Sequence, residues 1–303
     1  MPTDIDGPNP LYLSSLYKDL DSLVSNVAIE AFTTVLSIAE KGHKESQVIV
    51  AGCYMNGKGV SQSFEKAFSW YNVASENGSL DALFMLGVLY SDGCGVQKSP
   101  EIAHNYNLKA AKLGHILAQN RVGEDFYNGY GVLKSEKAAF KWYKKAAENG
   151  NAESQLKIGL AYSQGSPFRH NSKKALRWMT AAAEQNYIEA QHLLGMSYHL
   201  GNGISQSNEK AVFWLELAAK NEHIYSQYCI GKIYLTSNTN LLGAKHWLTS
   251  ASKNNHSGAQ LLLGTMYYDG VGVEKSKEEG FHWIEKSAAA GNETAISVLN
   301  SIS

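Results

Sequence analysis

Histidine and cysteine supply the metal ligands, general bases and nucleophiles of many protein sites, and this chain has ten histidines and three cysteines. His192 and His199 are seven residues apart, which places them two turns apart on one face of a helix. A metal site needs a third ligand in suitable geometry, and the spacing implies none. Cys53, Cys94 and Cys229 have no His and Asn or Asp partners at a spacing typical of a nucleophilic site. We therefore predict no metal, cofactor or catalytic residue.

Pairs of glycines separated by one residue could suggest a phosphate-binding loop. A Walker motif needs Gly-Lys-Ser or Gly-Lys-Thr entering a helix directly after a strand. Here each pair follows a predicted helix and recurs along the chain. The pairs are Gly57/Gly59, Gly93/Gly95, Gly129/Gly131, Gly201/Gly203 and Gly270/Gly272. We interpret them as turns, in which glycine supplies the left-handed backbone that ends a helix.

The composition excludes several classes of function. The 303 residues are 44% hydrophobic and 18% charged, and the formal net charge of −1 lacks the basic excess of nucleic-acid-binding proteins. No apolar run approaches the roughly 18 residues of a membrane span. The acidic start has neither the basic nor the apolar region of a secretory signal, although a leader removed beforehand would leave the same sequence. With an odd number of cysteines as well, we expect a cytoplasmic protein without a disulfide framework.

A repeat of about 36 residues organises the chain, and it is marked by a large aromatic residue at intervals of 36, 36, 36, 36, 33 and 36. These residues are Trp70, Tyr106, Trp142, Trp178, Trp214, Trp247 and Trp283. A small residue, usually Ala, lies three positions before and four positions after each ring, on one face of a predicted second helix. We expect the ring to fill the space between helices that the small residues allow to approach.

A second marker defines the first helix of each repeat: a small residue followed three positions later by Tyr or Phe, as in Gly87 and Tyr90. After the turn, a Ser or Asn stands where the second helix must begin, which is the residue type favoured at a helix N-cap. The predicted N-caps are Ser63, Ser99, Ser135, Asn171, Ser207, Asn240 and Ser276. Face, stop and start signals together predict an all-α repeat protein.

These positions together resemble the Sel-1-like repeat, a relative of the tetratricopeptide repeat with a longer inner turn. Residues 119–150 carry the pattern, with Val-Gly-Glu-Asp-Phe-Tyr-Asn-Gly-Tyr-Gly-Val followed by Lys-Ala-Ala-Phe-Lys-Trp-Tyr-Lys-Lys-Ala-Ala-Glu-Asn-Gly. The resemblance covers about residues 42–291. It implies an α/α right-handed superhelical solenoid of about seven helix-turn-helix repeats with terminal half-repeats. Two turns depart from it, because the turn at 165–170 lacks its second glycine and the turn at 236–240 is three residues shorter.

The repeat period predicts the organisation of the chain. We expect a disordered leader over residues 1–10, capping helices over 11–41 and a C-terminal capping helix over 292–303. The seven repeats are predicted at about 42–77, 78–113, 114–149, 150–185, 186–221, 222–254 and 255–291. Seven histidines follow this register. We expect a structural role at the start of the first helix for His43, His115, His223 and His256, and the outer surface of the second helix for His104, His246 and His282.

In tetratricopeptide-like solenoids the first helices line a concave groove, and the resemblance implies the same here. Residues at offsets −3, +1, +4 and +5 from the small marker form an exposed stripe that differs between repeats. The partner-binding candidates on it are Phe84, Val88, Asp92, Asn120, Glu124, Tyr127, Asn128, His192, Met196, His199, Tyr228, Lys232, Tyr268 and Asp269. The stripe also contains Leu160 and Leu200, and for Leu156, Leu160 and Leu261 packing between helices is the alternative explanation.

These observations predict a non-catalytic scaffold or adaptor that holds a protein or peptide in the groove, with no nucleic acid and no membrane insertion. One alternative is a bacterial immunity protein that neutralises a toxin by binding. An alternative of another class is a hydrolase such as a β-lactamase-like enzyme, which would need convergent titratable groups in a closed pocket. A third alternative is a structural role through the terminal helices. We expect a monomer, or a weak homodimer that forms through those helices.

Overall fold

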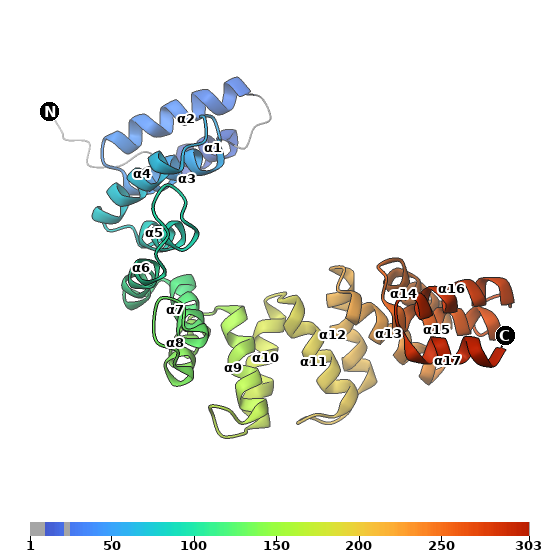
Figure 1. Ribbon diagram of the computed structural model, residues 1–303. Coiled ribbons are helices and arrows are strands. Elements are labelled where there is room, and N and C mark those ends of the chain that lie inside the picture. Colours follow the sequence, from blue (N-terminus) through green and yellow to red (C-terminus); the bar gives the residue numbers. More distant parts are fainter. Residues whose placement is uncertain (1–9, 21–24, 303) are drawn as a thin grey trace. The chain divides into compact units, whose positions relative to one another are not determined.

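A computed structural model describes residues 10–20 and 25–302, and over these ranges the chain is all-helical, with seventeen α-helices and no strand (Figure 1). The helices are α1 (Pro10–Leu20), α2 (Ser25–Glu40), α3 (Lys44–Asn56), α4 (Phe64–Glu76), α5 (Leu80–Asp92), α6 (Pro100–Lys112), α7 (Ile116–Asn128), α8 (Glu136–Glu148), α9 (Ala152–Gln164), α10 (Ser172–Glu184), α11 (Ile188–Leu200), α12 (Asn208–Lys220), α13 (Ile224–Ser237), α14 (Leu241–Lys253), α15 (Ser257–Asp269), α16 (Lys277–Ala289) and α17 (Glu293–Ile302). From α3 to α16 the helices form pairs in the predicted register. The all-α repeat fold is confirmed.

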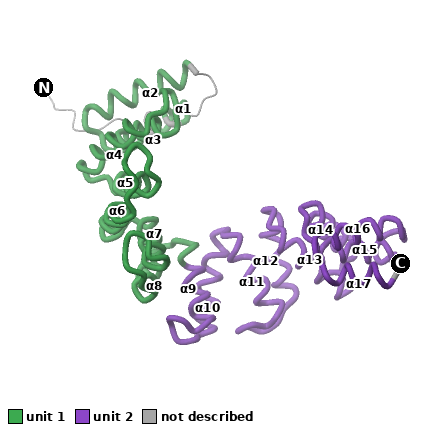
Figure 2. Tube along the Cα trace, viewed as in Figure 1, with its two compact units in different colours: residues 1–154 green, residues 155–303 purple. Residues whose placement is uncertain are grey.

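The chain divides into two compact units, residues 1–154 and residues 155–303 (Figure 2). The predicted leader, residues 1–10, lies outside the described residues except for Pro10, with which α1 begins. In both units the two helices of a repeat pack on each other, for example α5 on α6 and α11 on α12. Within each unit a second helix also packs on the first helix of the following repeat, as α6 does on α7 and α12 on α13.

All seven predicted N-caps of the second helices are confirmed. In each, the side-chain oxygen accepts a hydrogen bond from the backbone N–H three residues later, which satisfies a donor that the helix itself leaves unpaired. The first helices use histidine in the same way. The Nδ1 atoms of His43, His115, His223 and His256 accept the N–H of the third helical residue. The predicted structural role of these four histidines is therefore confirmed.

The two unusual turns solve the same problem with other residues. In the regular turns a left-handed glycine ends the first helix, as Gly201 does with φ 72°. The sixth turn uses Asn238 instead, with φ 53°, and asparagine is among the few other residues that adopt this conformation readily. The fourth turn keeps Gly165 at φ 76° and then places the ring of Phe168 on that of Tyr162, with the ring centroids 4.7 Å apart.

The space between the two helices of a repeat is filled by the residue after each aromatic marker, not by the marker itself. Leu215 is fully buried, and a Cβ atom added to Gly195 would lie 2.7 Å from its Cγ atom, whereas the marker Trp214 is only partly buried. If the small residue three before the marker is i, the residue after the marker is i+4 and the small residue four after the marker is i+7. These three positions lie on one helix face, and the residue after the marker is at its centre. The expectation that the marker rings fill this space is wrong for that reason.

Candidate functional site

The predicted stripe residues lie on the first helices α5, α7, α11, α13 and α15, and they divide into four groups according to their neighbours. The residues at offset −3 lie beside the start of the next first helix. The ring of Phe84 stacks on His115 at 5.0 Å, and that of Tyr228 stacks on His256 at 4.4 Å, both between ring centroids. His192 Nδ1 lies 2.9 Å from Ser226 Oγ. These side chains join consecutive repeats, so a partner meets them only in part.

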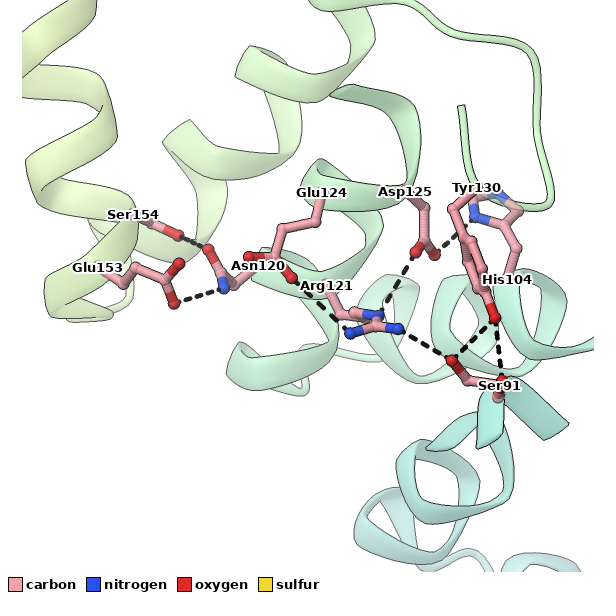
Figure 3. Close-up of polar contacts among 9 residues, drawn as sticks. All are labelled: Ser91, His104, Asn120, Arg121, Glu124, Asp125, Tyr130, Glu153 and Ser154. Carbon is pink, nitrogen blue, oxygen red and sulfur yellow. Dashed lines mark hydrogen bonds and ion pairs between the residues drawn. The ribbon is translucent and has the colours of Figure 1, made fainter. Parts of the chain in front are cut away.

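Asn120 is the fullest example of this joining role. Its side chain donates through Nδ2 to Glu153 Oε2 at 3.0 Å and accepts at Oδ1 from Ser154 Oγ at 2.7 Å (Figure 3). Asn120 is only 8% exposed. The expectation that it lies on an open surface is wrong, because the first turn of α9 supplies two polar groups that cover it.

Glu124 belongs to a polar network that the stripe did not predict (Figure 3). Arg121 lies between Glu124 Oε2, at 4.0 Å from Nη1, and Asp125 Oδ1, at 3.5 Å from Nε. Its Nη2 atom donates to Ser91 Oγ at 3.0 Å, and the Tyr130 hydroxyl donates to the backbone oxygen of Ser91 at 3.0 Å. The network ties α7 and the turn after it to the end of α5.

On its buried side this network includes His104, which was expected on an outer surface. His104 is 4% exposed, and its Nδ1 atom donates to Asp125 Oδ2 at 2.9 Å (Figure 3). That expectation is wrong for His104, although His246 and His282 are exposed as predicted. The signal was present in the sequence, because most other repeats have apolar residues at the positions of both His104 and Asp125.

The residues at offset +4 contact the second helix of their own repeat. Tyr127 and Tyr268 make edge-to-face contacts with Phe140 and Phe281, at centroid distances of 6.5 Å and 5.5 Å. His199 Nδ1 lies 2.9 Å from Asn208 Oδ1. Tyr127 is nevertheless 46% exposed, with Lys134 Nζ 5.8 Å from the centre of its ring.

Of the six remaining candidates, four are exposed. Asp92, Asn128 and Asp269 end their helices as exposed side chains, and Lys232 is exposed with its Nζ atom 5.9 Å from the centre of the Tyr228 ring. Val88 and Met196, at offset +1, are partly buried. Within each unit, the candidates thus differ in their neighbours and in their exposure.

The second unit contains an open hollow of about 530 Å³ between α9, α10 and α11, lined by both apolar and polar side chains. Its large apolar residues are Leu160, Leu176, Met179, Leu193, Met196 and Leu200. Its other lining residues are Ser163, His170, Ser172, Ala175, Ser197, Asn202 and Gly203. Leu160, Met196 and Leu200 come from the predicted stripe. Leu176, Met179 and Leu193 were not predicted, because none of the three occupies a first-helix offset of the stripe.

Leu200 at the edge of this hollow is unusual in its repeat position. Its side chain is 57% exposed, whereas the same position in the other six repeats holds a polar residue. Those residues are Asn56, Asp92, Asn128, Gln164, Thr236 and Asp269. An exposed leucine beside other apolar side chains is the kind of surface that protein partners cover.

The described residues give little support for a metal site or a membrane span. Across residues 10–20 and 25–302, no three His, Cys, Asp or Glu side chains are arranged to hold a metal ion. Within the same ranges, no helix combines the length and the apolar composition that a membrane span requires. A smaller hollow of about 300 Å³ lies beside the short sixth turn, lined by Glu209, Ile233 and Tyr234 among others.

Comparison with protein-family models matches six segments of the chain to one family. Six segments match the family model described as the Sel1 repeat: residues 44–79, 80–115, 116–151, 152–187, 188–223 and 257–292. The unmatched stretch between the fifth and sixth segments contains the shortened repeat. No curated protein matches the chain.

Two solved structures are similar over nearly the whole chain. One is a protective antigen of uropathogenic Escherichia coli strains with an SLR fold, at 27% identity and a TM-score of 0.83, covering 96% of this chain and 67% of the antigen. The other is a Sel1 repeat protein from Oxalobacter formigenes, at 27% identity and a TM-score of 0.67, covering 96% and 90%. Because the family model matches most of the length of this chain, the chain belongs to the Sel1 repeat family.

Proposed function

We propose that this protein is a non-catalytic scaffold that binds a protein or peptide partner, and that the hollow between α9, α10 and α11 is its main contact site. The observation that carries the proposal is Leu200, an exposed leucine at a repeat position that is otherwise polar, beside an open hollow of about 530 Å³. An exposed apolar side chain beside a hollow that other apolar side chains line favours a covered surface. Membership of a repeat family that presents extended surfaces supports the same function.

The chemistry of the hollow favours binding over catalysis. His170 is its titratable lining residue, and no carboxylate lines it. The Ser172 hydroxyl lies 3.4 Å from His170 Nε2, but this contact is exposed, whereas general acid–base catalysis needs such a pair held in a site that excludes water. A cytoplasmic location, and a monomer or a weak homodimer through the terminal helices, remain predictions that accompany this proposal.

The test uses the full chain and two leucine variants. Proteins that the wild-type chain retains are identified by mass spectrometry, prepared pure and titrated calorimetrically against wild type and variants. Leu200→Asp should abolish the binding of a true partner, because it places a charge beside the apolar side chains of the hollow. Leu133→Asp is the control, since Leu133 is 90% exposed in the first unit and lies outside the hollow. Unchanged far-ultraviolet circular dichroism confirms folding, and a partner that binds Leu200→Asp normally contradicts the proposal.

A further inference from the structure

One stretch of the second unit that borders the hollow carries positive charge only. Between Glu153 and Glu184 there is no Asp or Glu, whereas the stretch contains Lys157, Arg169, Lys173, Lys174 and Arg177. The whole chain has a formal net charge of −1, so this positive charge is local. It coincides with the helix and the turn that line the hollow.

Three of these cations lie next to lining residues. On α10 the hollow is lined by Ser172, Ala175, Leu176 and Met179, which share one helix face. Lys173 and Arg177 directly follow Ser172 and Leu176 and are four residues apart, so they are neighbours along the edge of that face.

The third cation beside the hollow is Arg169. Arg169 directly precedes the lining residue His170 in the turn. Arg169, Lys173 and Arg177 are exposed, and none of the three has an ion-pair partner among the residues that the structure describes. Lys174 differs, since its Nζ atom lies 5.2 Å from the centre of the Tyr162 ring.

The start of α10 lacks the acidic residue that most other second helices have. α4, α6, α8, α12 and α16 carry Glu in the first turn, where a negative charge is favourable beside the positive end of the helix dipole. The first turn of α10 carries none and contains two lysines. The uncompensated helix end and the neighbouring cations act in the same direction, so the positive potential at this edge is available to a partner.

A comparison within the chain shows that charge alone is not the distinguishing feature. Residues 224–256 also contain Lys and no Asp or Glu. The shallow hollow on α14 in that stretch is lined by Lys245, Lys253 and one large apolar residue, Leu242. Beside α10, in contrast, positive charge adjoins a hollow with six large apolar side chains.

We propose that this hollow binds an acidic segment of a partner protein, which inserts a leucine-sized apolar side chain between α9, α10 and α11 while its carboxylates pair with Arg169, Lys173 and Arg177. The inference rests on the proposed function and adds the chemistry of the partner. A nucleic acid would satisfy the cations but has no aliphatic side chain for the hollow. Apolar contact supplies the anchor, and charge complementarity speeds association and selects the segment.

The first experiment measures fluorescence anisotropy of a labelled short peptide with a central leucine flanked by glutamates, added to the full chain. The wild-type chain should bind it, and binding should weaken as salt rises from about 0.1 M to 1 M, over which the Debye length falls from about 10 Å to 3 Å. Lys173→Glu with Arg177→Glu should weaken binding at least about tenfold, since two attractive contacts become repulsive. A peptide with lysines in place of glutamates should not bind, and one with alanine in place of leucine should bind more weakly.

The chain offers a closely matched control. Lys137 and Lys141 on α8 occupy the repeat positions of Lys173 and Arg177, are also exposed, and do not line the hollow. Lys137→Glu with Lys141→Glu changes the net charge by the same amount and should leave the affinity for the acidic peptide nearly unchanged. Equal loss in both double variants would reduce the effect to net charge and overturn the proposal, as would failure of the wild-type chain to bind.

The remaining outcomes separate this inference from the proposed function. If the α10 charge reversal leaves an identified partner bound while Leu200→Asp releases it, the acidic segment is wrong and the scaffold function stands. If neither variant affects the partner, both fail. Binding to phosphatidylserine vesicles that the α10 reversal abolishes, without peptide binding, would assign the surface to a membrane instead. Concentration-dependent dimers in light scattering that Leu200→Asp dissociates would assign the hollow to a second copy of the chain.

Discussion

His104 Nδ1 lies 2.9 Å from Asp125 Oδ2 in a place where both side chains are almost completely enclosed, with side-chain exposures of 6% and 2%. The pair joins α6 to α7, and Arg121 contacts the other oxygen of the same carboxylate at 3.5 Å. The ring of His104 also makes an edge-to-face contact with Phe126 at 5.2 Å. A polar pair thus occupies positions that most other repeats fill with apolar side chains.

Removing one partner of this pair should destabilise the protein strongly. Asp125→Ala leaves the His104 N–H buried without an acceptor and Arg121 without its nearest carboxylate, so we expect a loss of about 3 kcal/mol in the free energy of unfolding. Chemical denaturation followed by circular dichroism measures it. Asp92→Ala, at an exposed helix end, is the control and should change stability by less than about 0.5 kcal/mol. A similar small change in Asp125→Ala would show that the pair contributes little.

Asn107 is a position where the protein can be made more stable. It is 1% exposed, and its Oδ1 atom has no hydrogen-bond partner, whereas the same position holds Leu215 and Leu248 in later repeats. Asn107→Leu should raise the free energy of unfolding by about 1–2 kcal/mol, because it removes an unpaired buried carbonyl and adds apolar burial. The melting temperature reports the gain. Asn105→Leu, at an exposed position of the same helix, should show none.

Two helical glycines should respond to alanine in opposite directions. A Cβ atom on Gly195 would lie 2.7 Å from Leu215 Cγ and 3.0 Å from the Ala211 backbone oxygen, so Gly195→Ala should cost about 1–3 kcal/mol through overpacking. At Gly52 the nearest atom is the Tyr71 hydroxyl at 3.8 Å, so Gly52→Ala should gain about 0.5–1 kcal/mol from helix propensity. Urea titrations of both variants measure this contrast. Equal effects at the two sites would contradict the packing geometry.

The histidine N-caps predict that stability decreases in mild acid. His256 Nδ1 accepts the Ala259 N–H at 3.1 Å, which requires an unprotonated nitrogen. Burial lowers the pKa of His256 below its usual 6.5. The pKa of His192 is also lowered, mainly by burial and to a smaller extent by the charge of His223. The unfolded chain therefore takes up protons before the folded chain does, so the contribution to stability is complete above pH 6.5 and is lost as the pH falls through the lowered folded pKa values.

Asparagine is a suitable replacement for His256, because Asn151 and Asn292 occupy the same cap position in other repeats. Their side chains accept the backbone N–H at 2.8 Å and 3.1 Å. His256→Asn should keep the cap at pH 7.5 and reduce the loss of stability between pH 7.5 and pH 5. Denaturant midpoints at the two pH values measure the difference. If the variant loses as much stability as the wild-type chain, His256 does not contribute to the pH dependence.

The local features of the fold could be predicted from the sequence because they depend on residues close together in the chain. Ser63 caps α4 by reaching a backbone N–H three residues away, and Gly201 ends α11 through its own backbone angle. The helix boundaries, the caps and the repeat register all have this short range. Even the shortened sixth turn keeps a left-handed residue at its helix end, Asn238.

Side-chain burial between repeats was decided only by the tertiary structure. Asn120 has the helix offset of an exposed residue, but Ser154 and Glu153 of the next first helix cover it. His104 likewise lies opposite Asp125, and neither residue's exposure can be read from its own helix. The hollow beside Leu200 depends on Leu176 and Leu193, which occupy other offsets and converge only when α10 and α11 pack. Periodicity assigns a residue to a face of its helix, but the volume and polarity of the neighbouring side chains determine whether that face is open.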